Sequence, residues 1–186
     1  NRLAAAKIAK GRKVLDCFTH TGAFALNCAY AGAEHVTAVD VSKDAVIMTE
    51  ANAVLNGLEG RMDFKCADVF ELLTEMAKEG KCPYDYIILD PPAFTKSSST
   101  VKNAERGYKE INMKAMKLLP RGGYLATCSC SHFMRDDLFR KMLHSAAADA
   151  NVELRQIEAR QQSPDHPILW NVPETDYLKF YIFQIV

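Results

Sequence analysis

The sequence predicts an α/β fold: a twisted, mostly parallel sheet with helices on both faces. Short apolar runs alternate with longer segments of helical period along the 186 residues, which is typical of strands joined by crossover helices. The run Tyr86–Leu89 is apolar at every position, as expected of a strand covered on both faces. The last segment, 176–186, alternates and is rich in aromatic residues, which indicates a final antiparallel strand.

Three strand–helix units are expected in the first half of the chain, because each apolar run is followed by a turn and a segment of helical period. Their strands cover 12–18, 35–40 and 61–66, and their helices cover 23–31, 42–56 and 69–78. Gly32 closes the first helix, Ser42 is a suitable N-cap for the second, and Asn56-Gly57 ends it.

The second half is expected to complete the sheet with strands over 86–89, 124–128, 152–159 and 176–186, helices over 106–119 and 136–148, and an irregular segment over 161–175. Pro91 and Pro92 cannot continue a ladder, so the strand before them must end at Asp90. The polar segment 93–105 lacks periodicity and is long for a connection, so we expect a lid loop there.

Composition limits the class of protein. A chain that is 48% hydrophobic is expected to form one globular domain over 1–186, without a membrane anchor and located in the cytoplasm. The six cysteines form no Cys-x-x-Cys pair, which favours free thiols over a disulfide framework. Lys plus Arg and Asp plus Glu both total 23, so the chain lacks the basic charge of a strong nucleic-acid binder.

Chemically informative side chains stand where strands are expected to end. Asp90 follows the fourth strand, and Cys130 follows the fifth. Because the carboxyl ends of neighbouring parallel strands meet at one edge, we expect a carboxyl and a thiol at one site. Asp40 and Asp68 follow the second and third strands, where each is either a ligand group or an acid capping the next helix. The first loop, 19–22, lacks the Gly-x-Gly-x-x-Gly pattern of pyrophosphate-binding dehydrogenases.

In this order the motifs resemble a known family; they are Asp16-Cys-Phe-Thr-His-Thr-Gly22, Asp40, Asp68, Asp90-Pro-Pro-Ala-Phe94 and Ser129-Cys-Ser131. The chain is similar to the class I S-adenosylmethionine-dependent methyltransferases. Within them it resembles the large-subunit ribosomal RNA cytosine methyltransferases, which make 5-methylcytosine. The resemblance covers essentially the whole chain. It implies a Rossmann-like, seven-stranded, mostly parallel sheet with an antiparallel last strand.

The resemblance also implies how the site residues divide. Those expected to hold the cofactor, S-adenosyl-L-methionine, are Asp16, Phe18, Thr19, Thr21, Gly22, Asp40, Val41, Asp68, Val69, Asp90 and Pro91. Those expected at the substrate are Pro92, Phe94 and Arg106. Arg2 matches a family arginine that touches the cofactor carboxylate, and His166 is either a brace of the site's rim or a structural histidine.

The chemistry of cytosine methylation explains why a thiol and a carboxyl are needed. Carbon 5 is a poor nucleophile until a thiolate adds at carbon 6, so the catalytic residues are expected to be Cys130 as nucleophile and Asp90 on the base edge. The alternative for Cys130 is a small buried hydrophobe. By the two-residue period of a strand, Cys128 shares a face with Cys130 and is the other thiol that could be taken for the nucleophile. Together with His132 the two thiols are too crowded for zinc, so no metal is expected.

Ribosomal RNA is the expected partner, and a homodimer is left open. In the family, a small RNA-binding domain and a linking domain precede the catalytic one. Residues 1–7 already look like the middle of a helix and no Met begins the chain. We therefore expect this chain to be the C-terminal part of a longer protein, in which an N-terminal domain provides most of the RNA binding.

Three other functions compete with this interpretation. An enzyme acting on an exocyclic amine of adenine or guanine would carry an aromatic residue directly after the prolines, where this chain has Ala93. A catalytically silent RNA-binding module would have no need of Asp40, Asp90 and Cys130. A small-molecule methyltransferase is disfavoured by Asp-Pro-Pro.

Overall fold

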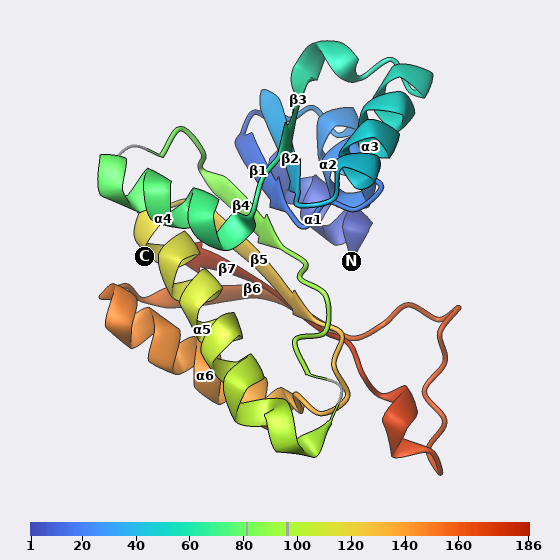
Figure 1. Cartoon of the computed structure of the whole chain (residues 1–186), viewed down its shortest axis with the longest axis vertical. Helices are drawn as coiled ribbons and strands as arrows, with labels where there is room; N and C mark the ends of the chain where they lie inside the picture. Colours follow the sequence, from blue (N-terminus) through green and yellow to red (C-terminus); the bar gives the residue numbers. More distant parts are fainter. Residues whose placement is uncertain (81, 96) are drawn as a thin grey trace.

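The computed structural model describes residues 1–80, 82–95 and 97–186 (Figure 1). Within these ranges seven strands form one sheet in the order β3-β2-β1-β4-β5-β7-β6. The strands are β1 (Lys13–Cys17), β2 (His35–Asp40), β3 (Met62–Cys66), β4 (Tyr86–Leu89), β5 (Tyr124–Ser129), β6 (Leu154–Arg160) and β7 (Lys179–Ile185). The pairs on the β3 to β5 side are parallel, whereas β7 runs antiparallel to both β5 and β6. The predicted fold class is confirmed.

Helices cover both faces of the sheet (Figure 1). One face carries α1 (Arg2–Ala9), α2 (Ala23–Tyr30) and α3 (Lys43–Leu55), and the other carries α4 (Val69–Glu79), α5 (Val101–Leu118) and α6 (Asp136–Ala150). Short 3-10 turns lie at η1 (Glu59–Arg61), η2 (Ser98–Thr100) and η3 (Pro173–Thr175). None of the described helices is long and apolar enough to cross a lipid bilayer.

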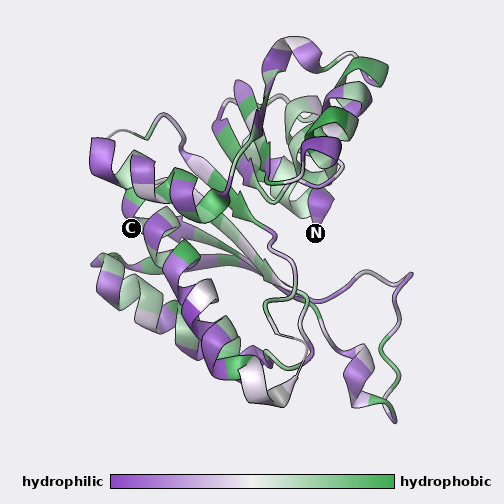
Figure 2. Ribbon diagram, in the orientation of Figure 1, coloured by the Kyte–Doolittle hydropathy of each residue, from purple (hydrophilic) through white to green (hydrophobic). Residues whose placement is uncertain are grey.

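The core consists of two apolar layers separated by the sheet. On β4, Ile87 and Leu89 pack toward α4, α5 and α6, whereas Tyr86 and Ile88 pack toward α1 and α2. All four side chains are fully buried, as predicted for a strand covered on both faces. In Figure 2 the central strands are coloured mainly hydrophobic, and hydrophilic residues lie along the outer sides of the helices.

One predicted boundary was wrong by several residues. α5 begins at Val101 and not at Arg106, and η2 stands directly before it. The expected loop over 93–105 is therefore shorter, and Lys96 within it lies outside the described residues. The first turn of α5 is polar because it faces solvent, with only Ala104 buried, so it shows no apolar period. The other bounds differ from prediction by a few residues, and Ser42 caps α3 as expected.

The β1–α2 loop is held in a special backbone conformation. Phe18, His20 and Gly22 have φ values of 63°, 51° and 84°, in the left-handed region. Asp16, at the end of β1, anchors this loop from inside: its Oδ2 accepts from Thr19 Oγ1 at 2.7 Å and from the Ala25 N–H at 3.0 Å. The loop is thereby fixed at the carboxyl edge of the sheet.

Gly22 is required for two reasons, and each has a measurable cost. An added Cβ would be strained at this φ, and it would lie 2.7 Å from Thr49 Cγ2. Gly57 has a similar φ of +65° with nothing within 4 Å, so it is the matched control. We expect Gly57→Ala to cost about 1–2 kcal/mol of unfolding free energy through the backbone alone. Gly22→Ala should cost about 1–3 kcal/mol more through the steric conflict. Urea unfolding measures both, and equal losses would contradict the packing account.

Asp16 should make stability depend on pH. Burial raises its pKa to about 7 from 3.8, and its other oxygen, Oδ1, has no hydrogen-bond partner in the described part of the chain. The folded chain then holds a proton that the unfolded chain releases. The free energy of unfolding should therefore fall as the pH rises from about 4 to about 7, by on the order of 2–4 kcal/mol.

Asp16→Asn should remove this dependence, because an amide keeps the acceptor for Thr19 and Ala25 but does not titrate. Urea unfolding at several pH values measures the slope. Asp137→Asn, which removes an exposed carboxylate paired with Arg135, is the control. Parallel pH profiles for the wild type and Asp16→Asn would contradict the assignment.

Candidate active site

The ends of β4 and β5 are tied together by polar contacts between the loops that follow them. Ser131 Oγ donates to the Thr95 carbonyl at 3.1 Å, and Ser129 Oγ donates to the Tyr108 hydroxyl at 3.1 Å. The Tyr108 ring in turn packs on Phe94, with centroids 4.6 Å apart. The positions of the residues between these anchors, Asp90 and Cys130 among them, are therefore set by the sheet and α5.

Asp90 and Cys130 lie at this edge, close enough for the Asp90 charge to affect the ionisation of the Cys130 thiol. Burial, followed by the Asp90 charge, raises the pKa of the half-buried Cys130 thiol. Three groups act in the opposite direction: the backbone N–H of Cys130, the Lys179 ammonium and the backbone N–H of Ala93. Burial likewise raises the pKa of Asp90. A carboxyl and a thiol therefore lie near each other at the carboxyl ends of β4 and β5.

Cys128 lies beside Asp90 on the core side. Its thiol is 2% exposed and acts on Asp90 as a hydrogen-bond donor, which lowers the pKa of that carboxyl. Burial and the Asp90 charge raise the pKa of Cys128 well above its usual value. Of these two cysteines, Cys128 is buried and Cys130 is half-buried. Within the described ranges, no group of three or more His, Cys, Asp or Glu side chains could hold a metal ion.

The Asp40 carboxylate stands two strands away along the same edge. Its Oδ2 accepts from the His20 N–H at 3.0 Å, and its Oδ1 accepts from the Ser42 N–H at 2.9 Å. Each oxygen has further acceptor capacity, because a carboxylate oxygen takes more than one hydrogen bond. The half-buried carboxylate is held rigidly, with both oxygens available to a pair of hydroxyl groups.

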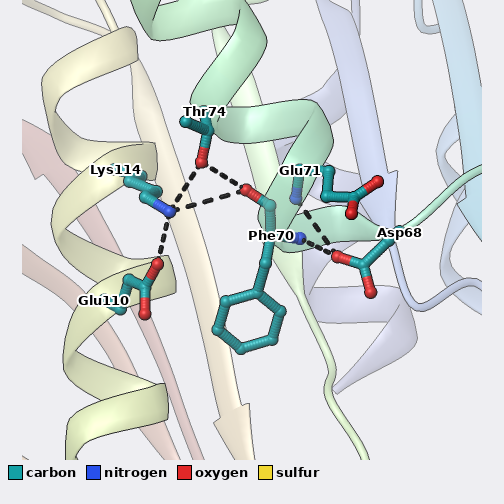
Figure 3. Close-up of polar contacts among 6 residues, drawn as sticks. All are labelled: Asp68, Phe70, Glu71, Thr74, Glu110 and Lys114. Atoms are coloured by element: carbon teal, nitrogen blue, oxygen red, sulfur yellow. Dashed lines mark hydrogen bonds and ion pairs between the residues drawn. The ribbon is translucent and has the colours of Figure 1, made fainter.

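Asp68 is the N-cap of α4, which is the structural alternative foreseen for it. One oxygen accepts from the N–H groups of Phe70 at 2.7 Å and Glu71 at 3.1 Å (Figure 3). Figure 3 draws both bonds to the same oxygen, and the second oxygen points away from the helix. The side chain is exposed. The cap therefore fixes the carboxylate without using its second oxygen, and a ligand role is compatible with it.

Several predicted cofactor residues help to shape the loop after β1. Asp16 is 1% exposed and Thr19 is 5% exposed, and both point inward. Thr21 contributes its carbonyl, which accepts from Asn52 Nδ2 at 3.0 Å. Phe18 is half-buried, and its ring packs edge-on with that of Phe94, with the two ring centroids 6.5 Å apart. Among the rest, Val69 and Pro91 are buried and Val41 is 68% exposed.

The predicted substrate residues are dispersed. Phe94 packs among Phe18, Phe70 and Tyr108, so its ring belongs to an aromatic cluster and is not free to stack on a base. Pro92 and Arg106 are exposed, Pro92 beside Asp90 and Arg106 on α5. Outside this set, His166 is an exposed residue next to Asp165 in the segment after β6.

Two further residues near Cys130 were not predicted from the sequence. Tyr108 accepts from Ser129, and Lys179 donates to the Ser131 carbonyl at 2.6 Å. Both are buried polar residues inside apolar periods. Arg2, in the first turn of α1, is close enough to Asp90 to lower the pKa of that carboxyl.

Comparison with known proteins gives consistent matches. The family described as S-adenosylmethionine-dependent methyltransferase matches residues 1–183. The Ribosomal RNA large subunit methyltransferase I of Shewanella denitrificans is 45% identical over 100% of this chain and 47% of its own length. The protein of the same name from Erwinia tasmaniensis is 42% identical, again over 47% of its length. The chain thus spans about half the length of the curated relatives it matches.

Solved structures share the fold. SMU.776, a methyltransferase complexed with SAH, superposes with a TM-score of 0.85 at 22% identity, covering 98% of this chain and 48% of that one. TrmN from Thermus thermophilus gives a TM-score of 0.69 at 23% identity, covering 100% of this chain and 47% of that one. The strand order, the match over residues 1–183 and these structures lead to one conclusion: the chain belongs to the S-adenosylmethionine-dependent methyltransferase family.

Proposed function

We propose that this chain carries the site that methylates carbon 5 of a cytosine in ribosomal RNA, through a transient bond from Cys130. One observation carries the proposal: Cys130 and Asp90 stand at adjoining strand ends, close enough for the Asp90 charge to raise the pKa of the Cys130 thiol. The relatives named Ribosomal RNA large subunit methyltransferase I, at 45% and 42% identity, support the choice of RNA.

The residues along the carboxyl edge of β1, β2, β3 and β4 fit S-adenosylmethionine. Asp40 offers two fixed oxygens to the ribose hydroxyls, and Asp68 keeps one oxygen free for the adenine amine. The loop over 18–22 leads into the amino end of α2, which favours the carboxylate of the methionine part. The cofactor supplies an electrophilic methyl group on sulfur. In this arrangement Asp90 borders that methyl.

Cys130 performs the activating step. Its thiolate adds to carbon 6 of the cytosine, which ends the ring's aromaticity and makes carbon 5 able to attack the methyl. After methyl transfer, a water molecule accepts the proton from carbon 5, the electrons of that bond re-form the double bond between carbons 5 and 6, and the bond from carbon 6 to Cys130 breaks with its electrons returning to sulfur. The thiolate is thereby restored. Cys130 suits this cycle because its sulfur is accessible, whereas that of Cys128 is buried.

Asp90 stabilises the base while Cys130 is bonded to it. Burial favours the protonated carboxyl, which can donate a hydrogen bond to ring nitrogen 3 as negative charge develops there. Protonation of Asp90 also removes the negative charge that opposes ionisation of Cys130. The two groups thus work as a pair that prefers one negative charge over two.

The base must leave its stack to reach this site, because neither Cys130 nor Asp90 projects far from the sheet edge. We propose that the part of the longer protein outside this chain supplies most of the grip on RNA, since the chain itself has zero formal charge. Methylation of an exocyclic amine is disfavoured by Phe94, whose ring is engaged with Tyr108.

The proposal is tested by two cysteine variants in the full-length protein. Cys130→Ala should lower methylation of ribosomal RNA by at least about 10³-fold, because the activating nucleophile is lost. Cys128→Ala should keep activity within about tenfold, since it removes only one hydrogen bond to Asp90. The rate is measured with labelled S-adenosylmethionine, and the product is identified by mapping bisulfite-resistant cytosines. A fully active Cys130→Ala enzyme, or a product on an exocyclic amine, would refute the mechanism.

A further inference from the structure

Lys179 is a buried cation beside the proposed nucleophile. It lies on β7 opposite Ser129 and is 7% exposed. Its Nζ donates to the carbonyl of Ser131 at 2.6 Å and to that of Tyr177 at 2.8 Å. The Ser131 bond fixes the ammonium at the turn that carries Cys130.

Buried ammonium groups are normally paired with a carboxylate, but Lys179 forms no ion pair with any described residue. Asp136 and Asp176 are the acids that act on it, and both are engaged elsewhere: Asp136 accepts from the Tyr181 hydroxyl, and Asp176 accepts from Gln161 at 3.4 Å. Two carbonyls occupy two of its three protons. The group that most favours its charged form is Cys130.

We propose that Lys179 is the positioning residue of the nucleophile: its ammonium, tethered to the Ser131 carbonyl, favours the thiolate form of the Cys130 sulfur over the thiol. The inference rests on the proposed function, in which Cys130 is the nucleophile. It adds a residue to which no role in the reaction has been given.

The surroundings of Cys130 explain why a fixed cation is needed. Burial and the Asp90 charge both raise the pKa of the thiol, and the Lys179 ammonium opposes them. Burial in turn lowers the pKa of Lys179 to about 8, while Cys130 raises it. A thiolate and an ammonium therefore stabilise each other at a place where neither is favoured alone. Besides these two, the titratable groups that act on the pair are Asp90, Asp136 and Asp176, and Cys130 in turn acts on Tyr108 and Cys128.

Lys179 also lines a groove of about 890 Å³ that includes Arg135, Arg160 and Trp170, whose side chain is 98% exposed. Basic and aromatic side chains in a groove suit single-stranded RNA. An alternative role for Lys179 is therefore to contact a phosphate, and the test must separate the two roles.

The test measures how fast iodoacetamide alkylates Cys130 as a function of pH, in the full-length protein without RNA or cofactor, by peptide mass spectrometry. Lys179→Met and Lys179→Gln should slow alkylation of Cys130 about tenfold at pH 7.5. This corresponds to a rise of about one unit in the pKa of the Cys130 thiol. Lys179→Arg, which keeps the charge, should stay within about threefold. Lys114→Met, which removes a lysine bound to Thr74 and Glu110, is the matched control. The exposed thiol of Cys66 serves as the internal standard.

Unchanged alkylation of Cys130 in folded Lys179→Met and Lys179→Gln would overturn the inference, and weaker RNA binding by those variants would then assign Lys179 to phosphate. A second measurement needs no change at Lys179. By linkage, Cys130→Ser should lower the midpoint at which the Lys179 ammonium titrates by NMR, and an unshifted midpoint would overturn the inference. Neither readout uses methyl transfer, so failure here is distinct from failure of the proposed function, which Cys130→Ala decides.

Discussion

The register between β4 and β5 is the constraint on which the proposed site depends. Leu89 pairs with Thr127, so the next residues, Asp90 and Cys128, come side by side at the end of the ladder. Cys130 stands two residues further along, beyond the last strand pair. A shift of one residue would turn Asp90 and both thiols away from each other. The buried strands on either side of this pair prevent such a shift.

The same register gives the two thiols different chemistry. Cys128 is enclosed by the layer that packs against α1 and α2, and it serves Asp90 as a buried donor. Cys130 has left the sheet and lies under the loop after β4, where Ala93 provides a backbone N–H. In the proposed mechanism, protonation of Asp90 leaves Cys130 facing one cation. We propose Lys179 as that cation, and it reaches the site because β7 runs antiparallel to β5 and begins where β5 ends.

The sheet and its order of elements were accessible from the sequence because buried strands such as Tyr86–Leu89 leave a short run of consecutive apolar residues. The meeting of Asp90 and Cys130 followed from the rule that parallel strands end at one edge. The start of α5 was missed because its exposed first turns carry no apolar period. The inward role of Asp16 and Thr19 was missed because the cofactor motif and the loop anchor use the same residues. Lys179 was missed because a lysine inside an apolar strand shows its role only once its carbonyl partners are placed in space.

The central claim is that the sulfur of Cys130 bonds to a cytosine that Asp90 holds from its edge. The most direct measurement uses ribosomal RNA containing 5-fluorocytosine at the target position, with the full-length protein and S-adenosylmethionine. Fluorine on carbon 5 cannot leave as a proton does, so the adduct should persist through denaturing electrophoresis. Mass spectrometry of the digested adduct should then place the nucleotide on Cys130. The absence of a stable adduct under conditions that methylate normal RNA, or an adduct on Cys128 or another residue, would contradict the account.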